Sequence, residues 1–234
     1  MLINIIPDIH GEIKWKELID LSCDKIIFLG DYVDSFTITN EQIINNLNEI
    51  ITLKKEYLDK VILLWGNHDL MYYHINDLDF RCSGFRPEIG LTLHEIFSNN
   101  NKLFQYAHQI NNYIFTHAGI QNNWFTTKFK GNINKNIADQ LNNPIDRGQF
   151  KALHQVGYRR GGYSDVGGIV WCDKNELTKP LKNYNQIVGH THTNEVKEFI
   201  FSSDKLNKFN SKNIVYFCDC LDSLSKPLIF KIND

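Results

Sequence analysis

Short apolar runs alternate with amphipathic stretches in the first third of the chain. Residues 2–6, 25–29 and 61–65 are rich in branched apolar side chains, and a proline or a glycine follows each run. Such runs are typical of buried strands. Residues 12–21 show helical spacing of apolar side chains, as does the stretch that begins with a capping-box pattern at Thr39. The order strand–helix–strand–helix–strand predicts a parallel sheet with right-handed crossovers.

The later part of the chain predicts further strands. Residues 104–110 and 113–116 flank Asn111-Asn112, a pair that is typical of a hairpin turn. Strands are also expected over residues 186–188, 198–202, 213–218 and 228–232. Together these segments predict a second sheet, mostly antiparallel, that faces the first.

Polar donors follow the predicted strands at the point where each strand ends. The donors are Asp8, His10, Asp31, Asp34, Asn67, His68, His117, His190 and His192. Ligands of parallel sheets bind at the carboxyl ends of the strands. Hydrophobic packing does not require a charged cluster after each strand, so this recurrence points to a functional site.

These donors have the chemistry of metal ligands. Carboxylates and imidazoles that are buried apart are costly, whereas around cations they become ligands. Mixed oxygen and imidazole donors suit Mn, Fe or Zn, and their number exceeds the four of a single closed site. Two ions that share a bridging carboxylate would use them all and would favour in-line displacement at phosphorus. The residues therefore predict a binuclear phosphoester hydrolase.

Composition places the chain among globular proteins. Of its 234 residues, 42% are hydrophobic and 22% are charged, and the formal net charge is -2. These values exclude wholesale disorder and argue against a broad nucleic-acid-binding surface. The length fits a single domain over residues 1–234.

The cysteines and the apolar runs bear on the location of the protein. Five cysteines form an odd set without regular spacing, which favours a reducing compartment. The N-terminus lacks the features of a signal peptide, and no apolar run reaches the roughly 20 residues of a membrane helix. A cytoplasmic protein without membrane contact is expected.

Five ordered motifs resemble those of the calcineurin-like metallophosphoesterases. They are Asp8-x-His10, Gly30-Asp31-x-x-Asp34, Gly66-Asn67-His68-Asp69, His117-Ala118-Gly119 and Gly189-His190-x-His192. Each motif follows a predicted strand, and together they span most of the chain. The resemblance implies a four-layered α/β/β/α sandwich, in which two mixed sheets are flanked by helices.

The resemblance also implies a role for each donor. Asp8, His10 and His192 match the ligands of a first metal, and Asn67, His117 and His190 match those of a second. Asp31 matches the bridging carboxylate. His68 matches the acid that protonates the leaving oxygen, and Asp34 matches the carboxylate that orients it. The family uses two divalent or trivalent ions, here most simply Mn, with Fe or Zn as alternatives, and attacks with the hydroxide that they hold.

The sequence departs from the phosphoprotein phosphatases in its arginines. Ser35 and Phe36 stand where that branch has Arg and Gly, so a phosphate-binding arginine is missing beside the second motif. Arg159 and Arg160, at the start of a glycine-rich loop, are candidates to supply that charge. Residues 77–88 are predicted to form a loop whose arginines are solvated; a flap over the site is the alternative.

The expected function is a phosphatase that acts on a phosphoprotein or a small phosphomonoester. The alternatives are a phosphodiesterase or dinucleoside polyphosphate hydrolase, and, from another class, a non-catalytic metal-binding scaffold. The filled ligand positions argue against the scaffold. No nucleic-acid partner is expected.

Overall fold

The computed structural model describes residues 1–202 and 212–233, which fall into two compact units. Unit 1 comprises Met1–Gln105 and Cys220–Asp234, and unit 2 comprises Tyr106–Asp219. Each unit contains one five-stranded sheet and its own helices. Within the described ranges, no helix has the length and apolar character needed to cross a membrane.

The sheet of unit 1 is largely parallel. Its strand order is β10-β1-β2-β3-β4, in which β1 to β4 run parallel and β10 is antiparallel to β1. The strands are β1 (Leu2–Ile6), β2 (Lys25–Phe28), β3 (Val61–Leu64), β4 (Phe104–Gln105) and β10 (Leu228–Lys231). All of β3 and nearly all of β1 and β2 are buried, which explains their unbroken apolar sequences.

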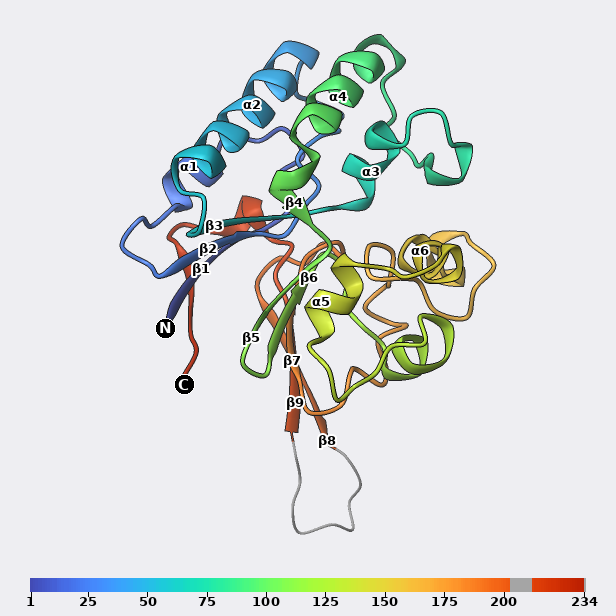
Figure 1. The fold of residues 1–234 in the computed structure, drawn as a ribbon. Coiled ribbons are helices and arrows are strands. Elements are labelled where there is room, and N and C mark those ends of the chain that lie inside the picture. The colour runs from blue at the N-terminus through green and yellow to red at the C-terminus, as the bar shows by residue number, and fades with distance from the viewer. Residues whose placement is uncertain (203–211, 234) are drawn as a thin grey trace. The chain divides into compact units, whose positions relative to one another are not determined.

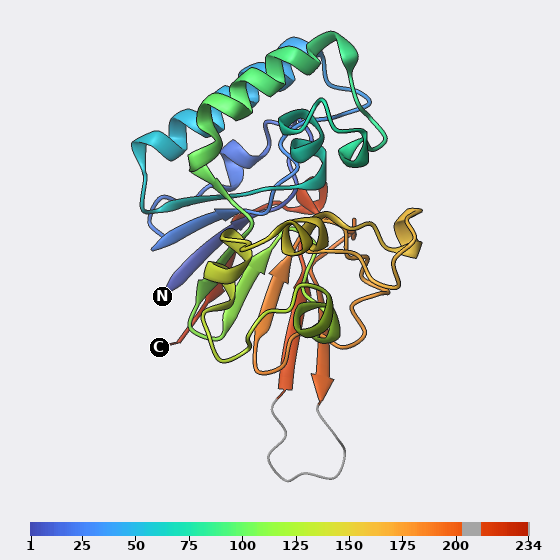
Figure 2. The same ribbon diagram turned by 45° about the vertical axis from the view of Figure 1, so that its right-hand side comes forward.

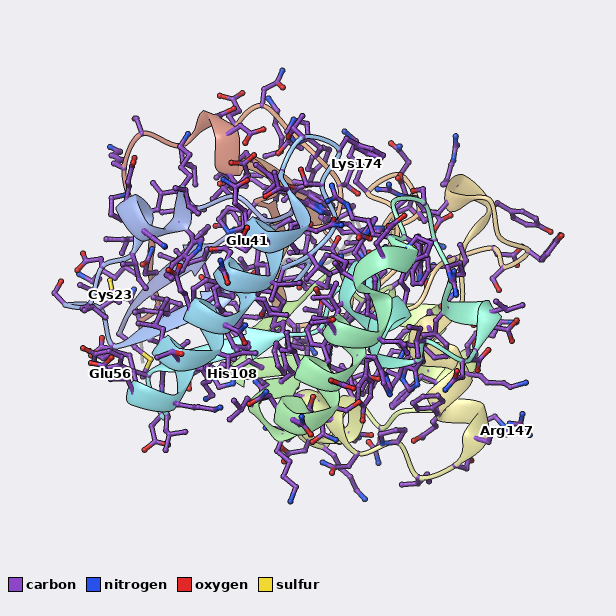
Figure 3. The ribbon with its side chains drawn as sticks, turned by 90° about the horizontal axis from the view of Figure 1, so that it is seen from above. Cys23, Glu41, Glu56, His108, Arg147 and Lys174 are labelled. Carbon is purple, nitrogen blue, oxygen red and sulfur yellow. The ribbon has the colours of Figure 1, made fainter. Side chains whose placement is uncertain are left out.

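Helices of unit 1 connect these strands (Figure 1). They are α1 (Trp15–Leu18), α2 (Asn40–Glu56), α3 (Asn67–Tyr73) and α4 (Pro87–Asn100), with 3-10 turns at Leu78–Phe80, Asn101–Leu103 and Leu221–Ser223. Thr39 caps α2 with the predicted capping box, because its side chain accepts from Gln42 N and Gln42 Oε1 accepts from Thr39 N. Glu41 and Glu56 mark the two ends of α2 in Figure 3.

The sheet of unit 2 has the strand order β5-β6-β7-β9-β8 (Figure 2). Its strands are β5 (Ala107–Ile110), β6 (Tyr113–Thr116), β7 (Asn185–Val188), β8 (Lys197–Ser202) and β9 (Lys212–Phe217). The two outer pairs are antiparallel and the two inner pairs are parallel. The helices are α5 (Ile137–Asn142) and α6 (Arg147–His154), with a π-helical turn at Trp124–Lys128 and a 3-10 turn at Tyr158–Arg160.

Two mixed sheets with helices confirm the predicted mixed α/β class. Three details of the prediction were wrong. The second sheet is evenly mixed rather than mostly antiparallel, because β7 pairs in parallel with both neighbours. The last strand joins the first sheet instead of the second. Residues 104–110 divide at Tyr106, so that β4 belongs to unit 1 and β5 to unit 2.

Candidate metal centre

The polar loops of unit 1 follow three neighbouring parallel strands. Ile6 pairs with Phe28, and Phe28 pairs with Leu63, so β1, β2 and β3 end at nearly the same level. The carboxyl ends of parallel strands share one edge of a sheet, where α/β proteins bind ligands. The loops that contain the predicted donors of unit 1 therefore start from one edge.

The backbone at these loops adopts left-handed conformations. His10, Asp31 and Asp34 have φ angles of 46°, 51° and 67°. Such values are uncommon and costly for residues other than glycine, and they persist where the surroundings enforce them. The surroundings here are backbone hydrogen bonds between two loops, since the amides of Ile9 and His10 both donate to the Asp31 carbonyl, at 3.0 and 2.8 Å. All three left-handed residues belong to the predicted site.

Asp8, His10 and Asp31 form a compact donor cluster. One ligand atom from each residue lies within 4.8 Å of the others, and His10 Nε2 is 3.7 Å from Asp31 Oδ2. His10 Nδ1 lies 2.9 Å from the Asp34 carbonyl oxygen, to which it donates. That bond places the ring proton on Nδ1 and leaves the Nε2 lone pair for a cation. Two carboxylates and a neutral imidazole are a donor set that fits Mn, Fe or Zn.

Asp69 holds the loops that carry this cluster. Its Oδ2 accepts from the amides of Asp31 and Gly66, both at 2.9 Å, and its Oδ1 accepts from the amide of Tyr32 at 2.8 Å. The side chain is fully buried. From the first turn of α3, Asp69 therefore supports the loops that carry Asp31 and Tyr32.

Gly66 allows Asp31 to approach the start of α3. A Cβ atom on Gly66 would lie 2.1 Å from Asp31 Oδ1 and 2.3 Å from its amide nitrogen. In the glycine's presence Asp31 Oδ1 accepts from the amide of His68 at 2.9 Å. The glycine of the third motif is therefore required by the close packing of Asp31.

Asn67 and His68 open α3 beside Asp34. His68 Nδ1 donates to Asp34 Oδ2 at 2.8 Å, which leaves Nε2 as the atom that can reach a substrate. Burial alone would lower the pKa of His68, but the charge of Asp31 and the hydrogen bond to Asp34 outweigh it and raise that pKa well above its usual value. Asn67 is buried, and its amide nitrogen lies 3.9 Å from Cys82 Sγ. The amide oxygen of Asn67 is the atom suited to a metal.

Two histidines of unit 2 lie against each other at the ends of parallel strands. His117 follows β6 and His190 follows β7, and His117 Nε2 is 3.1 Å from His190 Nδ1. His190 has a φ of 63°. Nitrogen atoms at this separation suit two ligands of one cation, whose metal–nitrogen bonds are about 2.0–2.1 Å. His192, two residues after His190, is exposed.

The two candidate arginines of unit 2 differ in their surroundings. Arg160 forms an ion pair with Asp173 at 3.0 Å, and its Nη2 donates to Thr191 Oγ1 at 2.9 Å, beside His190. Arg159 is exposed. Arg160 is thus the one tied to the loop that contains His190.

Glu176 holds the glycine-rich loop in place. This buried carboxylate accepts from the amides of Arg159 and Gly167, both at 2.9 Å, and from that of Asp173 at 3.3 Å. Sequence reasoning missed this role of Glu176, because the three amides are spread over 15 positions of the chain without periodic spacing.

The arginines of residues 77–88 correct the loop prediction. Arg86 is half-buried, and its guanidinium donates to the carbonyls of Ser35 and Ile38 and, at 2.6 Å, to Asn40 Oδ1. Arg81 lies over the ring of Phe85, 3.4 Å from its centroid. The prediction of solvated arginines is therefore wrong for Arg86, whose guanidinium bonds neighbouring carbonyls, whereas Arg81 is exposed as expected.

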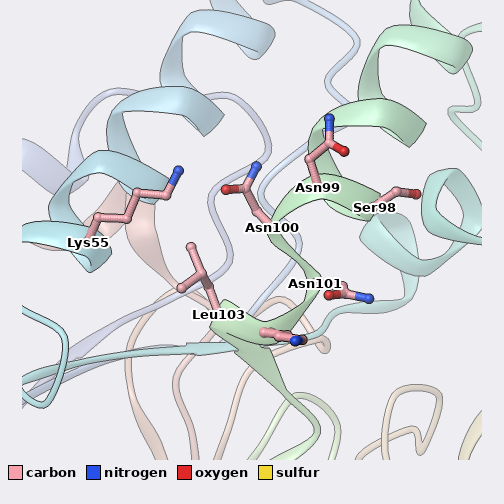
Figure 4. Close-up of a pocket in the computed structure, with 7 residues that line it drawn as sticks. Lys55, Ser98, Asn99, Asn100, Asn101 and Leu103 are labelled. Carbon is pink, nitrogen blue, oxygen red and sulfur yellow. The ribbon is translucent and has the colours of Figure 1, made fainter.

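A hollow elsewhere in unit 1 is separate from the donor cluster. Its volume is about 530 Å³. Lys55 of α2, residues 98–100 of α4 and residues 101–103 line it (Figure 4). None of the predicted site residues belongs to this lining, so the hollow does not alter the assignment of the site.

Comparison with known proteins bears on the fold and the family. A protein serine/threonine phosphatase from Saccharomyces cerevisiae resembles the chain with a TM-score of 0.52 and 15% identity, over 93% of this chain and 66% of that one. A cold-active protein tyrosine phosphatase resembles it with a TM-score of 0.51 and 17% identity, over 97% of this chain and 72% of that one. The chain thus spans just under two thirds of the length of the yeast phosphatase. At these identities the likeness concerns the fold. No curated protein matches the sequence significantly.

The sequence profile of the calcineurin-like phosphoesterases matches residues 1–213. The match covers all five motifs and most of each unit, and it agrees with the strand-end placement of the donors. The chain belongs to the calcineurin-like phosphoesterase family.

Proposed function

We propose that the protein is a metal-dependent hydrolase of phosphomonoesters, either small molecules or phosphoproteins. The observation that supports this most directly is the cluster of Asp8, His10 and Asp31. Their ligand atoms lie close together, and His10 and Asp31 have left-handed backbone conformations. Membership of a phosphoesterase family gives the cluster its chemistry. A structural role alone would not explain three costly backbone conformations at one sheet edge.

The seven predicted ligands would hold two cations. Asp8, His10 and His192 would bind the first, Asn67, His117 and His190 would bind the second, and Asp31 would contribute to both. Mn suits this mixture best, with Fe or Zn as alternatives. Cations bound by these residues would supply a water of lowered pKa for in-line displacement at phosphorus.

His68 and Asp34 act on the leaving group. Asp34 keeps the Nδ1 proton of His68 engaged, so Nε2 can present a proton to the oxygen that departs from phosphorus. Against the effect of burial, the charge of Asp31 and the hydrogen bond to Asp34 raise the pKa of His68, which favours the protonated ring that a general acid needs. Cations on Asp31 would weaken the part of that rise that its charge causes.

Arg160, and less directly Arg159, bind the phosphoryl oxygens. A guanidinium binds two phosphate oxygens at once, which a serine at position 35 cannot do. Arg160 donates a hydrogen bond to Thr191, the residue next to His190, which favours it over the exposed Arg159.

The proposal is tested by elemental analysis of the purified protein coupled to an activity panel. The panel contains phenyl phosphate, a phosphopeptide, bis-p-nitrophenyl phosphate and dinucleoside polyphosphates, each with Mn. We expect about two ions per chain and turnover of the monoesters. Fewer than one ion per chain, together with no hydrolysis of any ester, would instead favour a non-catalytic scaffold.

His68→Asn tests the assignment of the general acid. It should lower kcat by roughly 10²–10⁴-fold, the usual contribution of such a group, and leave the metal content unchanged. If this variant loses its metal ions, His68 is a ligand and the assignment is wrong.

A second candidate is hydrolysis of diesters or dinucleoside polyphosphates. Its support is Phe36, which is 92% exposed two residues after Asp34, where its ring is free to stack on a nucleobase. Faster turnover of nucleotides than of phenyl phosphate, lost selectively in Phe36→Ala, would favour this candidate.

A further inference from the structure

The carboxylate of Asp34 is bonded on both of its oxygens. Oδ2 accepts from His68 Nδ1 at 2.8 Å, and Oδ1 lies 2.5 Å from the hydroxyl of Tyr72. Tyr72 lies four residues after His68 in α3, one helical turn away on the same face. Its side chain is fully buried, although its ring ends in a polar group.

The direction of the Tyr72 hydrogen bond follows from its second partner. The amide of Arg86 lies 2.9 Å from the Tyr72 oxygen, and an amide can only donate. The hydroxyl therefore accepts from Arg86 and sends its own proton to Asp34. Burial and the charge of Asp34 raise the pKa of Tyr72, which keeps that proton in place.

The ring of Tyr72 is fixed by stacking. Phe85 stacks on the Tyr72 ring with centroids 5.1 Å apart and ring planes 22° apart. The guanidinium of Arg81 in turn lies over the ring of Phe85. Stacked and cation–π contacts of this kind hold a ring in one orientation. The hydroxyl is thus aimed by packing before any substrate binds.

The chain around Asp34 is held from the same segment. The Arg86 guanidinium bonds the loop that follows Asp34, at Ser35 and Ile38, while the Arg86 amide bonds Tyr72. Gly84, with a φ of 87°, passes so close that a Cβ there would lie 3.4 Å from Asp34 Oδ2. Residues 84–86 therefore hold both the backbone and the carboxylate at Asp34.

We infer that Tyr72 is a positioning residue that fixes the rotation of the Asp34 carboxylate, so that Oδ2 stays on His68 Nδ1 and the imidazole stays aimed. The inference rests on the proposed role of His68 as the general acid. Without the hydroxyl, the carboxylate rotates about its terminal torsion, which is soft, and the histidine loses its fixed partner. A partner that orients a functional imidazole typically contributes 10–100-fold to activity or binding.

The test is Tyr72→Phe, with Tyr73→Phe as its matched control. Tyr73 is the next residue of α3, and its hydroxyl accepts from Asn101 Nδ2 at 3.1 Å, away from Asp34. Both changes remove one hydroxyl from the same helix: Tyr72 loses its bonds to Asp34 and from the Arg86 amide, and Tyr73 loses its bond from Asn101. We expect Tyr72→Phe to lower kcat for phenyl phosphate by about 10-fold with KM unchanged, and Tyr73→Phe to retain the wild-type kcat.

The leaving group separates positioning from general damage. A p-nitrophenolate departs without a proton, whereas an alkoxide or phenolate needs one, so only poor leaving groups depend on the acid. Tyr72→Phe should lose much less activity on p-nitrophenyl phosphate than on phenyl phosphate, and His68→Asn should show the same trend more strongly. An equal loss on both esters would overturn the inference.

Proton NMR of the metal-free protein gives a readout that does not need activity. The His68 Nδ1 proton, hydrogen-bonded to Asp34, should give a slowly exchanging downfield signal in the wild type and in Tyr73→Phe. Faster exchange with water in Tyr72→Phe supports the inference, and an unchanged signal overturns it. If no ester is hydrolysed by the wild type, the proposed function fails, while this signal still decides whether Tyr72 positions the pair.

Discussion

The two units contribute different donors and support them differently. Unit 1 supplies carboxylates, and its site residues have three left-handed backbone positions and a buried carboxylate, Asp69, behind them. Unit 2 supplies the imidazoles of His117 and His190, with one left-handed position at His190. Buried carboxylates are far more costly than neutral imidazoles. The unit that concentrates negative charge therefore needs the more extensive internal hydrogen bonding.

Both units nevertheless use the same supporting device. Asp69 in unit 1 and Glu176 in unit 2 are buried carboxylates that each accept three backbone amide hydrogen bonds. Asp69 fixes the loops of the donor cluster, whereas Glu176 fixes the loop that carries Arg160. The difference predicts that the same kind of substitution will affect metal binding in one unit and substrate binding in the other.

The largest effect is expected from Asp31→Asn. Removing the charge that both cations share should reduce metal content from about two ions per chain toward none, and activity to background. His117→Asn should lose one ion while the carboxylate cluster of unit 1 keeps the other. Elemental analysis of both variants measures this, with the exposed Asp59→Asn as the control. Equal loss of metal in Asp31→Asn and His117→Asn would contradict the contrast between the units.

Asp69→Asn and Glu176→Gln compare the two supports. Each replacement turns an acceptor into a donor among backbone amides, at about 1–3 kcal/mol for each bond that is lost. We expect both to lower the Tm, and Asp69→Asn alone to weaken Mn binding, by about 10–100-fold. Calorimetry and Mn titration check these outcomes. Weakened Mn binding in Glu176→Gln as well would show that the supports are not specialised.

Arg160→Ala should act on substrate binding in unit 2. Losing charge-assisted bonds to phosphate costs about 1.5–3 kcal/mol, so KM should rise by roughly 10–100-fold with metal content unchanged. Arg159→Ala should raise KM less, because Arg159 is not held beside His190. Arg147→Ala, in an exposed arginine of α6 (Figure 3), is the control. If only Arg159→Ala raises KM, the two arginines have been assigned in the wrong order.

The smallest effect is the pH dependence of stability in the metal-free protein. The folded-state pKa of His68 is raised above the unfolded value of about 6.5, so the folded state binds more protons above that pH. The stabilisation is full below about pH 6.5 and is lost as pH rises through the raised pKa. The Tm of the wild type should fall over that window, and the Tm of His68→Asn should change less. Parallel curves would show that His68 does not contribute.

Local sequence was sufficient for the elements with a strong local signal. The continuous apolar runs predicted β1, β2 and β3, and the capping box at Thr39 predicted the start of α2. No element was predicted for the stretch that forms α4, although Pro87 opens the helix and its apolar side chains have helical spacing. The parallel pairing of β7 with β9 depends on contacts between distant segments, which no local pattern records.

The site shows the same contrast between residues with a local sequence signal and residues whose role depends on distant contacts. Its donors were found because each follows a strand in a short motif, and the structure brings Asp8, His10 and Asp31 together and His117 against His190. The residues that hold them carry a weaker signal: Asp69 stands in the third motif, but its bonds to the Asp31 and Tyr32 amides join distant segments, and Glu176 belongs to no motif. Tyr72 had a local signal, its spacing of four from His68, but only the contact with Asp34 gives that spacing a meaning.

The left-handed loops of unit 1 have a consequence for metal exchange. Hydrogen bonds among the loops and to Asp69 keep His10 and Asp31 in shape, so the binding geometry is built by the polypeptide itself. On the proposed metal site, an ion would leave and another would enter without refolding of the loops. Since similar donor sets accept several first-row metals, the occupant would follow the supply of each metal in the surroundings, and a change in that supply would alter the catalytic rate without any change in the amount of protein.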